Sequence, residues 1–413
     1  MGTNKQDEVQ KFLKSFVEEF ANPLGPDDHL PVAPLSRCLT PQEVTGESLD
    51  LGLKLLSARH APCWLSASMC HAAVSELLKD DLSPFHCPKD PEQPDDESHI
   101  VLLQSDPVQR LFINKLRAIG VAWQKVLPNQ EPRSTRSCLC SVHAIRNTRR
   151  KMEDRHVILT HFNQLLGLQD GVNREYYAVF DGHGGVDAAT YAATHLHVLL
   201  SQQETLHSDV TTAFKNSFTQ TDDMFRIKAK RERMRSGSTG VAVLLAGDWL
   251  TVAWLGDSQA MLVRRGEPVV LMDPHKPERE DEKQRIEELG GCIAYMGCWR
   301  VNGTYAVSRA IGDFDQKPYV SNAADSATLR LCGDEDYVLL ACDGFFDVLC
   351  PADVPGLVLA ALKYAGGSGE EVARSLVAEA KAAGSSDNIT VLLAFLRDPQ
   401  ELLGSETGQS AKN

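Results

Sequence analysis

Two aspartate–glycine pairs, Asp181-Gly182 and Asp343-Gly344, each follow an apolar run that is typical of a buried β-strand. The runs cover residues 176–180 and 337–342. Because glycine lets the backbone turn sharply, each aspartate is expected to stand at the end of its strand. Two such strand ends, brought together, would form an oxygen-rich site of the kind that binds hard divalent cations. A single Asp-Gly pair is more often a hairpin turn, so the interpretation depends on further acidic positions.

Further carboxylates follow at predicted strand ends or sharp turns, namely Glu153-Asp154, Asp257, Asp347 and Asp387. Taken alone, each could equally be a turn residue, a helix cap or a solvated carboxylate. Taken together, they would repel one another unless cations neutralised them. Ligand sets made only of oxygen favour Mg²⁺ or Mn²⁺ over zinc, which prefers cysteine and histidine. The sequence therefore predicts a centre for Mg²⁺ or Mn²⁺.

The composition narrows the classes of protein to which this chain can belong. Its 413 residues suffice for one large domain or two, and its 43% apolar and 24% charged residues are ordinary for a soluble globular protein. A formal charge of −14 argues against a general nucleic-acid binder, because affinity for phosphate backbones comes from lysine and arginine. The 11 cysteines form no Cys-x-x-Cys pair, so reduced thiols are expected rather than a disulfide framework or a zinc site.

The sequence also carries signals about its location in the cell. The N-terminus has no apolar signal core, and no run approaches membrane-spanning length. Gly2 could suggest myristoylation, but position 6, where Ser or Thr is expected, is Gln6. A cytoplasmic protein without a membrane partner is expected. The basic stretch 146–151 could be a solvated run or a nuclear-targeting patch. The stretch 228–235 could be a nuclear signal or a nucleic-acid patch, as an alternative to the exposed face of a helix or a surface that attracts phosphorylated substrates.

The pattern of the chain changes near residue 136. Residues 1–136 are expected to be a helical N-terminal extension with a regulatory or targeting role, interrupted by an acidic linker at 84–98. Helices are predicted at 42–57, 63–79 and 107–127. The apolar stripe of the last one, at i, i+3, i+4 spacing, is expected to pack on the body of the protein, with a docking face for a partner as the alternative.

Residues 137–397 mix strands and helices, and the tail at 398–413 is expected to be disordered. Strands are predicted at 139–145, 155–160, 176–180, 239–245, 250–255, 260–264, 268–272, 337–342 and 389–396. Helices are predicted at 186–200, 209–234, 278–289, 353–364 and 369–383. Neighbouring strands with short links indicate antiparallel sheets, which the long helices must cover. The predicted fold class is α+β, with a β-sandwich core.

A series of motifs follows the order typical of the metal-dependent protein serine/threonine phosphatases of type 2C. These are Glu153-Asp154, Asp181-Gly-His-Gly-Gly185, Ser236-Gly-Ser-Thr-Gly240, Gly256-Asp-Ser258, Ser308-Arg-Ala-Ile-Gly-Asp313, Asp343-Gly-Phe-Phe-Asp347 and Asp387-Asn388. The chain resembles that family over roughly residues 137–397. The resemblance implies a sandwich of two antiparallel sheets flanked by helices (αββα), with a two-metal centre at one end.

The resemblance also implies ligands for the two metal ions. Asp181 would bridge them, and Glu153 with the Gly182 carbonyl would complete one site. Asp343 and Asp387 would complete the other.

Three further carboxylates receive supporting roles from the same resemblance. Asp154 would orient metal-bound water. Asp257 and Asp347, together with Asp343, match positions that the family links to a weaker third metal ion, whose binding the sequence leaves open.

The chemistry of phosphate monoesters agrees with this assignment. Two cations bridged by a carboxylate activate water and neutralise the phosphoryl oxygens, so direct hydrolysis without a phosphoenzyme is predicted. Arg149 is the candidate for holding the substrate phosphate. His183 is the candidate general acid for the departing Ser or Thr oxygen, unless it is only a hydrogen-bonded residue of the turn.

Other functions are weighed against this interpretation. A cysteine phosphatase needs His-Cys followed by five residues and an arginine; His86-Cys87 is present, but the arginine position is Gln93. The Gly-x-x-x-x-Gly-Lys-Ser/Thr loop that binds nucleotides is absent from the sequence. A degenerate phosphatase fold that serves only as a scaffold, and a metal-dependent nuclease, remain alternatives. Metal-dependent turnover of a phosphothreonine peptide would distinguish all three.

Residues 143–156, residues 298–303 and the helical extension resemble those type 2C phosphatases that act on calcium/calmodulin-dependent protein kinases. This implies such kinases, phosphorylated on threonine, among the substrates. The N-terminal helices are candidates for binding scaffolds of the kinase pathway, although nothing in their residues identifies a partner.

Overall fold

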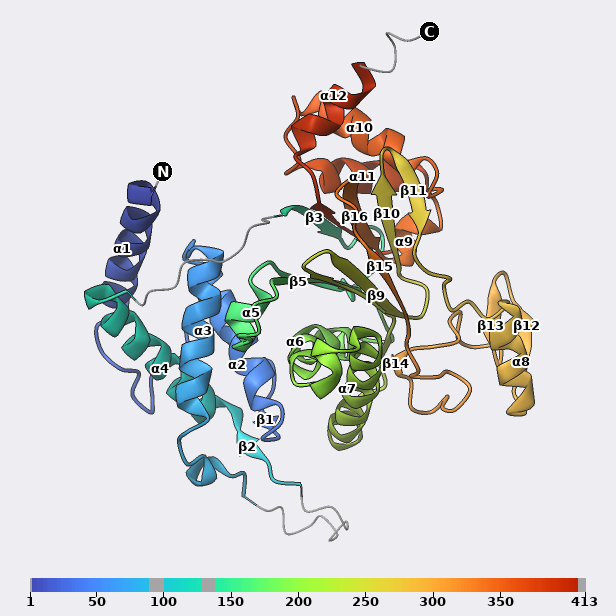
Figure 1. Ribbon diagram of the computed structural model, residues 1–413. Helices are drawn as coiled ribbons and strands as arrows, with labels where there is room; N and C mark the ends of the chain where they lie inside the picture. The colour runs from blue at the N-terminus through green and yellow to red at the C-terminus, as the bar shows by residue number, and fades with distance from the viewer. Residues whose placement is uncertain (1, 89–99, 128–137, 408–413) are drawn as a thin grey trace. The chain divides into compact units, whose positions relative to one another are not determined.

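The computed structural model describes residues 2–88, 100–127 and 138–407. The chain forms two compact units, shown together in Figure 1. The first comprises Met1–Ser134 with His161–Gly171, and the second Thr135–Thr160 with Val172–Asn413. The division thus falls close to the change of pattern near residue 136, but a short segment inside the later region joins the first unit. The acidic part of the predicted linker lies outside the described residues.

The first unit is built from helices and one two-stranded sheet. Its helices are α1 (Gly2–Glu19), α2 (Val44–Ser57), α3 (Cys63–Leu77), η1 (Ser83–Phe85), α4 (Ser105–Lys125) and α5 (Phe162–Leu166), and its strands are β1 (Cys38–Leu39) and β2 (Leu103–Gln104). The apolar stripe of α4, with Val108, Phe112 and Leu116 fully buried, packs inward, and α4 contacts α1, α2 and α3. This stripe therefore stabilises the unit, as the sequence predicts.

The second unit contains two five-stranded sheets in which every neighbouring pair is antiparallel. The strand orders are β11-β10-β16-β17-β3 and β15-β9-β8-β5-β4. The bounds of these strands are β3 (Leu139–Ile145), β4 (Arg155–Leu159), β5 (Arg174–Phe180), β8 (Gly240–Ala246), β9 (Trp249–Leu255), β10 (Gln259–Arg264), β11 (Glu267–Val270), β15 (Asp325–Arg330), β16 (Glu335–Ala341) and β17 (Ile389–Phe395). The fold class predicted from the sequence is confirmed.

The two sheets share an apolar core because both have fully buried central strands. Side chains of β5, β8 and β9, such as Val179 and Val243, meet those of β10, β16 and β17, such as Leu340 and Leu392. Burying these branched side chains on both faces explains why the strands appear as continuous apolar runs. The core holds the strand ends in fixed positions.

Helices cover the outer face of each sheet (Figure 1). α6 (Asp187–Ser201) contacts β5, and α7 (Val210–Glu232) contacts β9 and β15. On the other sheet, residues of α9 (Asp343–Phe346), α10 (Val354–Tyr364), α11 (Val372–Ala382) and α12 (Pro399–Thr407) share a core with β10, β16 and β17. The short elements η2 (Glu204–His207), β6 (Gly182–His183), β7 (Gly237–Ser238) and β14 (Ile311–Gly312) complete the second unit together with the α8 region described below.

The hairpin predicted at residues 264–267 is confirmed, since Arg264 pairs with Glu267 across a two-residue turn. Both turn residues, Arg265 and Gly266, have positive φ angles, of 51° and 79°. Such a turn matches the twist of the strands it joins. The turn thereby sets the register of β10 against β11.

The region after Arg397 corrects one prediction. The sequence predicts a disordered tail, whereas α12 (Pro399–Thr407) is helical. Leu402 is buried in the core cluster that includes residues of α10 and α11. Burial of this apolar side chain stabilises a helix that the mostly polar composition of the segment does not predict. Residues 408–413 lie outside the described residues.

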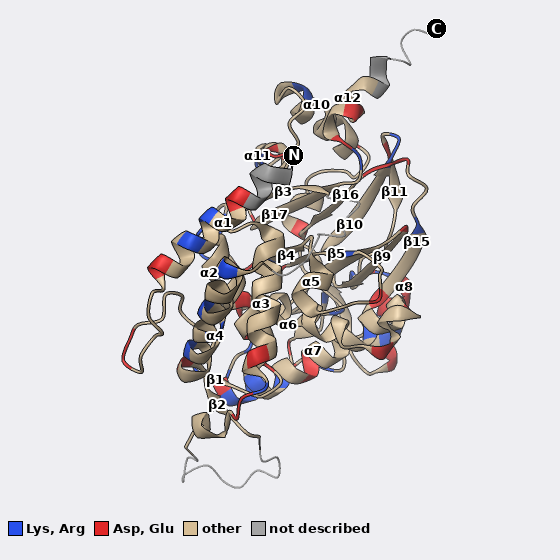
Figure 2. Ribbon diagram, turned by 60° about the vertical axis from the view of Figure 1, so that its left-hand side comes forward, with Lys and Arg blue, Asp and Glu red and all other residues tan. Residues whose placement is uncertain are grey.

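A small subdomain of the second unit consists of α8 (Glu280–Glu288) and the hairpin of β12 (Ile293–Tyr295) with β13 (Trp299–Val301). Its own apolar cluster includes Ile286, Val301 and Val320. Acidic side chains begin and end α8, and basic side chains lie between them (Figure 2). Among the helices of the described residues, none combines the length and the apolar character that a membrane span requires.

Candidate active site

Four acidic positions lie at strand ends of the sandwich. Asp154 immediately precedes β4, and Asp181 immediately follows β5. Asp343 begins α9 after β16, and Asp387 lies just before β17. Since β4 pairs with β5, and β16 with β17, the stacking of the two sheets brings these ends together.

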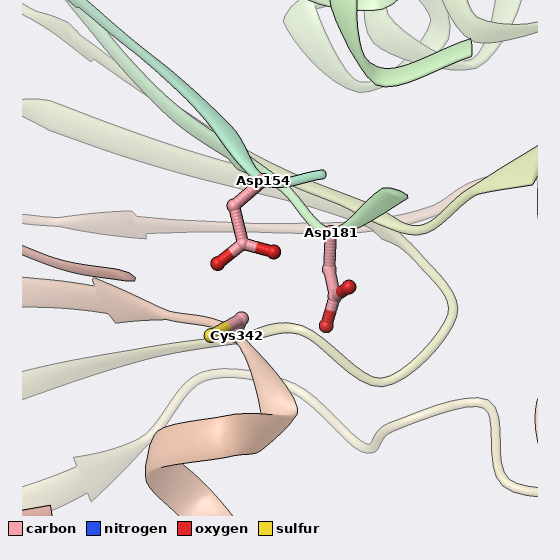
Figure 3. Close-up of side chains that lie close together, drawn as sticks. All are labelled: Asp154, Asp181 and Cys342. Carbon is pink, nitrogen blue, oxygen red and sulfur yellow. The ribbon is translucent and has the colours of Figure 1, made fainter. Parts of the chain in front are cut away.

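The tightest group of potential ligands in the described part of the chain is Asp154, Asp181 and Cys342. One atom from each side chain lies within 4.8 Å of the others. Figure 3 shows the two carboxylates projecting toward the same space, with the Cys342 side chain below them. Burial, with the charges of the nearby aspartates, raises the pKa of Cys342 well above its usual value. The thiol therefore stays protonated, and the carboxylates remain the donors for a cation.

The carboxylates of this site repel one another, so each makes the ionisation of its neighbours less favourable. Burial, followed by the charges of Asp343, Asp154 and Asp257, raises the pKa of Asp181 well above the usual value. Burial and the neighbouring Asp387 and Asp347 charges raise the pKa of Asp343, which shares a hydrogen bond with Asp181.

Asp257 shows the same effect, since burial and the Asp343 charge raise its pKa to about 8. A buried cluster of this kind either retains protons or binds cations that replace them. Its oxygen donors suit Mg²⁺ or Mn²⁺, so the residues present fit the metal ions that the sequence predicts.

Asp154 is held by a hydrogen bond from a residue of β17. Thr390 Oγ1 donates a hydrogen bond of 2.6 Å to Asp154 Oδ2. Burial, with the charges of Asp343 and Asp387, raises the pKa of Asp154 to about 6. The Thr390 hydrogen bond fixes one oxygen and leaves the other directed into the site.

Two glycines allow close backbone contact around the cluster. A Cβ on Gly182 would lie 2.6 Å from the Glu153 carbonyl oxygen, and one on Gly344 would lie 2.0 Å from the Asn388 carbonyl oxygen. Any larger residue would separate these segments. The predicted ligands Glu153 and Gly182 are therefore neighbours through their backbones.

Asn388 joins the loop that carries the basic residues to β17. Its side-chain oxygen accepts the Glu153 N–H at 2.8 Å, and its amide donates to the carbonyl oxygens of Arg146 and Lys151 at 2.9 and 3.0 Å. These bonds close the loop on both sides of Arg149. The loop thus has a defined place at the site.

Two basic side chains balance the outer carboxylates. Arg149, whose side chain is 58% exposed, pairs with Asp387. Lys276 Nζ lies 3.1 Å from Asp347 Oδ1. Arg149, the predicted phosphate-binding residue, therefore lies beside Asp387 with its guanidinium exposed, while Lys276 is a cation that the sequence does not single out.

His183 lies beside the cluster and is bound to a buried aspartate. Its Nε2 is 2.6 Å from Asp313 Oδ2. Burial alone would lower the pKa of His183, but the Asp313 hydrogen bond and the charges of Asp313, Asp257 and Glu153 raise it above the usual value. A protonated imidazole at this position can donate a proton.

The structure thus places the predicted residues in one region of the second unit, but they differ in how directly they contact the carboxylate cluster. Asp154 and Asp181 belong to the tightest group, and Asp343 is hydrogen-bonded to Asp181. Glu153 adjoins the group through backbone contact, and Asp387 through its ion pair with Arg149. The remaining members, Asp257 and Asp347, act on Asp343 through their charges.

Sequence reasoning assigned no role to four residues that the structure places here, namely Asp313, Cys342, Thr390 and Lys276. Asp313 ends a recognised motif, and Cys342 directly precedes the Asp343 motif. Their positions in the motifs are therefore the only signal that could have identified them. Thr390 appears in the sequence as an ordinary strand residue, and its contact depends on the packing of β17 beside Asp154.

A helix-covered sandwich with buried carboxylates at its strand ends defines the class of this protein, that of the metal-dependent phosphoprotein phosphatases. The family model described as Protein phosphatase 2C matches residues 139–389, and the chain belongs to that family. It is 53% identical over 411 residues to "Protein phosphatase 1F" of Homo sapiens, covering 98% of this chain and 90% of the relative. It is 49% identical over 365 residues to "Protein phosphatase 1E" of Homo sapiens, covering 88% of this chain and 48% of that protein.

Solved structures support the fold independently. The "Structure of a C.elegans sex determining protein" matches with a TM-score of 0.71 at 24% identity, covering 96% of this chain and 97% of that one. The "Crystal structure of serine-threonine phosphatase 2C from Toxoplasma gondii" matches with a TM-score of 0.56 at 22% identity, covering 65% of this chain and 96% of that one. The first of these similarities extends through both units of the chain.

Proposed function

We propose that this phosphatase hydrolyses phosphoserine and phosphothreonine in proteins at the carboxylate cluster, with two Mg²⁺ or Mn²⁺ ions as cofactors. The observation that carries the proposal is the crowding of buried Asp257 with the half-buried Asp181 and Asp343 as mutually repelling carboxylates. Such an arrangement costs free energy in the absence of cations and is relieved by them. Family membership supports the same chemistry.

The metal ligands follow the motif assignment. Asp181 would bridge the ions, with Glu153 and the Gly182 carbonyl on one side and Asp343 and Asp387 on the other. When bound, the ions supply positive charge to the phosphoryl oxygens and lower the pKa of coordinated water. The cluster around Asp343 is also consistent with a weaker third site that uses Asp257 and Asp347.

The side chains around the cluster would then divide the work on the substrate. Arg149 binds the phosphate through charge-assisted hydrogen bonds, since its guanidinium is exposed beside Asp387. Asp154, fixed by Thr390, orients the attacking water. His183, held by Asp313, donates a proton to the departing serine or threonine oxygen.

The proposal is tested by measuring phosphate release from a phosphothreonine peptide with Mg²⁺ or Mn²⁺ and again after EDTA. Release that depends on the added ion supports it. Peptide binding without release would indicate a scaffold, and cleavage of DNA or RNA under the same conditions would indicate a nuclease. Either of those results would overturn the proposal.

For substrates, we propose calcium/calmodulin-dependent protein kinases phosphorylated on threonine. The support is the resemblance of residues 143–156 and 298–303 to the phosphatases that act on such kinases. The test compares rates on an autophosphorylated kinase of this group with rates on unrelated phosphothreonine proteins at equal concentration. Equal rates on all substrates would contradict this specificity.

We also propose that the protein acts in the cytoplasm and that the first unit binds scaffolds of the kinase pathway. The support is the set of 11 cysteines present as thiols, which fits the reducing interior of the cell, and the compact helical unit that the N-terminal region forms. Imaging of the tagged full-length chain tests the location. Accumulation at membranes would contradict it, and accumulation in the nucleus would favour the basic stretches as targeting signals.

A further inference from the structure

Two cysteines of the first unit lie in direct contact although they are distant in sequence. Cys38 is in β1 and Cys87 follows η1, and their sulfur atoms are 3.3 Å apart across a separation of 49 residues. Both side chains are half-buried, so small oxidants can reach them. The contact lies wholly inside the first unit and does not depend on the phosphatase site.

The backbone around both cysteines is anchored to the same short strand. Cys38 is paired with Gln104 of β2. The Cys87 N–H donates a 2.8 Å hydrogen bond to the Leu102 carbonyl oxygen, and His86 is bridged to Leu103. Gln104 Nε2 also donates to the His86 carbonyl oxygen at 3.2 Å. The two sulfurs are therefore held together by structure on both sides rather than by a chance approach of loose segments.

A shared metal ion is a poor explanation for the pair. Structural zinc sites use four ligands, whereas among the residues that the structure describes two thiols meet here. Among the described residues, the one group of three or more potential ligands is that of Asp154, Asp181 and Cys342 in the other unit. A disulfide, in contrast, needs only the two sulfurs, which would have to approach by roughly 1.3 Å to reach bonding distance.

We propose that Cys38 and Cys87 form a reversible disulfide when the protein meets a peroxide. One thiolate attacks the O–O bond and becomes a sulfenic acid, with release of hydroxide that takes up the thiol proton as water. The second sulfur then attacks the first, so that the S–S bond forms, the S–O bond breaks and a second water leaves. Two thiols are oxidised and one peroxide is reduced to two waters, and a dithiol reductant reverses the change.

The disulfide would cross-link the first unit around its central helices. The chain between the two cysteines contains α2 and α3, both of which contact α4. Closing a loop of this length restricts the unfolded chain and stabilises the folded unit. Oxidation would therefore make the first unit more resistant to unfolding, without a change in the metal ligands of the second.

The experiment treats the reduced full-length protein with graded hydrogen peroxide, blocks remaining thiols with N-ethylmaleimide, and maps peptides by mass spectrometry without reduction. The expected product is a cross-linked peptide joining Cys38 to Cys87, with both sites lost from labelling together and restored by dithiothreitol. Thermal unfolding of the oxidised protein should show a Tm higher by at least about 2 °C. This readout uses the wild-type chain, so it does not depend on the folding of a variant.

Matched variants separate this pair from other thiols. Cys38→Ser and Cys87→Ser should each abolish the cross-link and the Tm increase, whereas Cys63→Ser, at an exposed thiol of α3, should leave both unchanged. The proposal is overturned if peroxide oxidises Cys63 while Cys38 and Cys87 stay open to labelling. It is equally overturned if Cys87 pairs with several other cysteines as readily as with Cys38.

Discussion

The half-buried His183 and the buried Asp313 form a pair at the edge of the carboxylate cluster, with His183 Nε2 2.6 Å from Asp313 Oδ2. Asp313 is only 1% exposed and adopts a positive φ of 47°, a conformation uncommon for a residue other than glycine. Its carboxylate fills the space beside Gly237, where a Cβ would meet Asp313 Oδ2 at 2.2 Å. The backbone is therefore shaped to place this carboxylate against the imidazole.

Replacing Asp313 with asparagine should shift the pH dependence of phosphopeptide hydrolysis. Asp313 raises the pKa of His183, so the proton-donating form persists to higher pH than it would alone. In Asp313→Asn the protonated imidazole is lost at lower pH, so the basic limb of the pH–rate profile should shift to lower pH. A fall in kcat of about 10-fold or more is expected near neutral pH. An unchanged basic limb would show that the pair does not control proton transfer.

Removing the imidazole should affect poor leaving groups most. In His183→Ala, hydrolysis of a phosphothreonine peptide should fall by about 100-fold, because the alkoxide leaves without a proton. Hydrolysis of an aryl phosphate, whose leaving group needs little protonation, should fall much less. Parallel assays on the two substrates, with exposed His207→Ala as control, measure the difference. Equal losses on both substrates would exclude the acid role.

The strands and the carboxylates were predictable from the sequence for a common reason. Central strands such as β5 and β16 are buried on both faces, so each appears in the sequence as a continuous apolar run. The ends of these runs therefore predict where the aspartates that follow them lie. The edge strand β15 was not predicted, since its alternating polar residues become a strand only through pairing with β9.

The parts of the site that could not be predicted depend on tertiary contacts. Thr390 reaches Asp154 across 236 residues of sequence, and no local pattern carries that information. Likewise, α5 lies within the catalytic region of the sequence but belongs to the first unit, because it packs against α3. Its five residues are too short to give a periodic signal.

Glu282 of α8 should make the stability of the second unit depend on pH. Burial opposes its charge, but Arg309 at 2.6 Å and Arg285 at 2.9 Å lower its pKa to about 2. The stabilisation is therefore complete above the pKa of the unfolded state and is lost as pH falls toward 2. Glu282→Gln should lower the free energy of unfolding by roughly 2–3 kcal/mol at pH 7 and by much less near pH 3.

Urea unfolding of the wild type and Glu282→Gln at both pH values measures this difference. Glu280→Gln, at an exposed position of the same helix, is the control and should change stability little. A deficit for Glu282→Gln that stays constant from pH 7 to pH 3 would contradict the ion-pair explanation.

Gly167 should be essential to the packing of α5. It ends that helix with a φ of 72°, and a Cβ there would lie 2.3 Å from His71 Cε1. Gly167→Ala should therefore cost about 1 kcal/mol for the conformation and more for the displaced His71. Gly171 has a φ of 79°, and no atom lies within 4 Å of a Cβ built there, so Gly171→Ala measures the conformational cost alone. Thermal unfolding should rank Gly167→Ala clearly below Gly171→Ala, and equal values would contradict the His71 contact.

The most direct test of the carboxylate cluster is calorimetric titration of Mn²⁺ into the wild type and Asp181→Asn, with phosphopeptide hydrolysis measured on the same samples. Asp181→Asn should weaken Mn²⁺ binding by at least about 10-fold and reduce hydrolysis in parallel, since it removes the central carboxylate of the cluster. The control Asp248→Asn, in the exposed β8–β9 turn, should retain both properties. Full Mn²⁺ affinity and full activity in Asp181→Asn would contradict the assignment of this cluster as the metal centre.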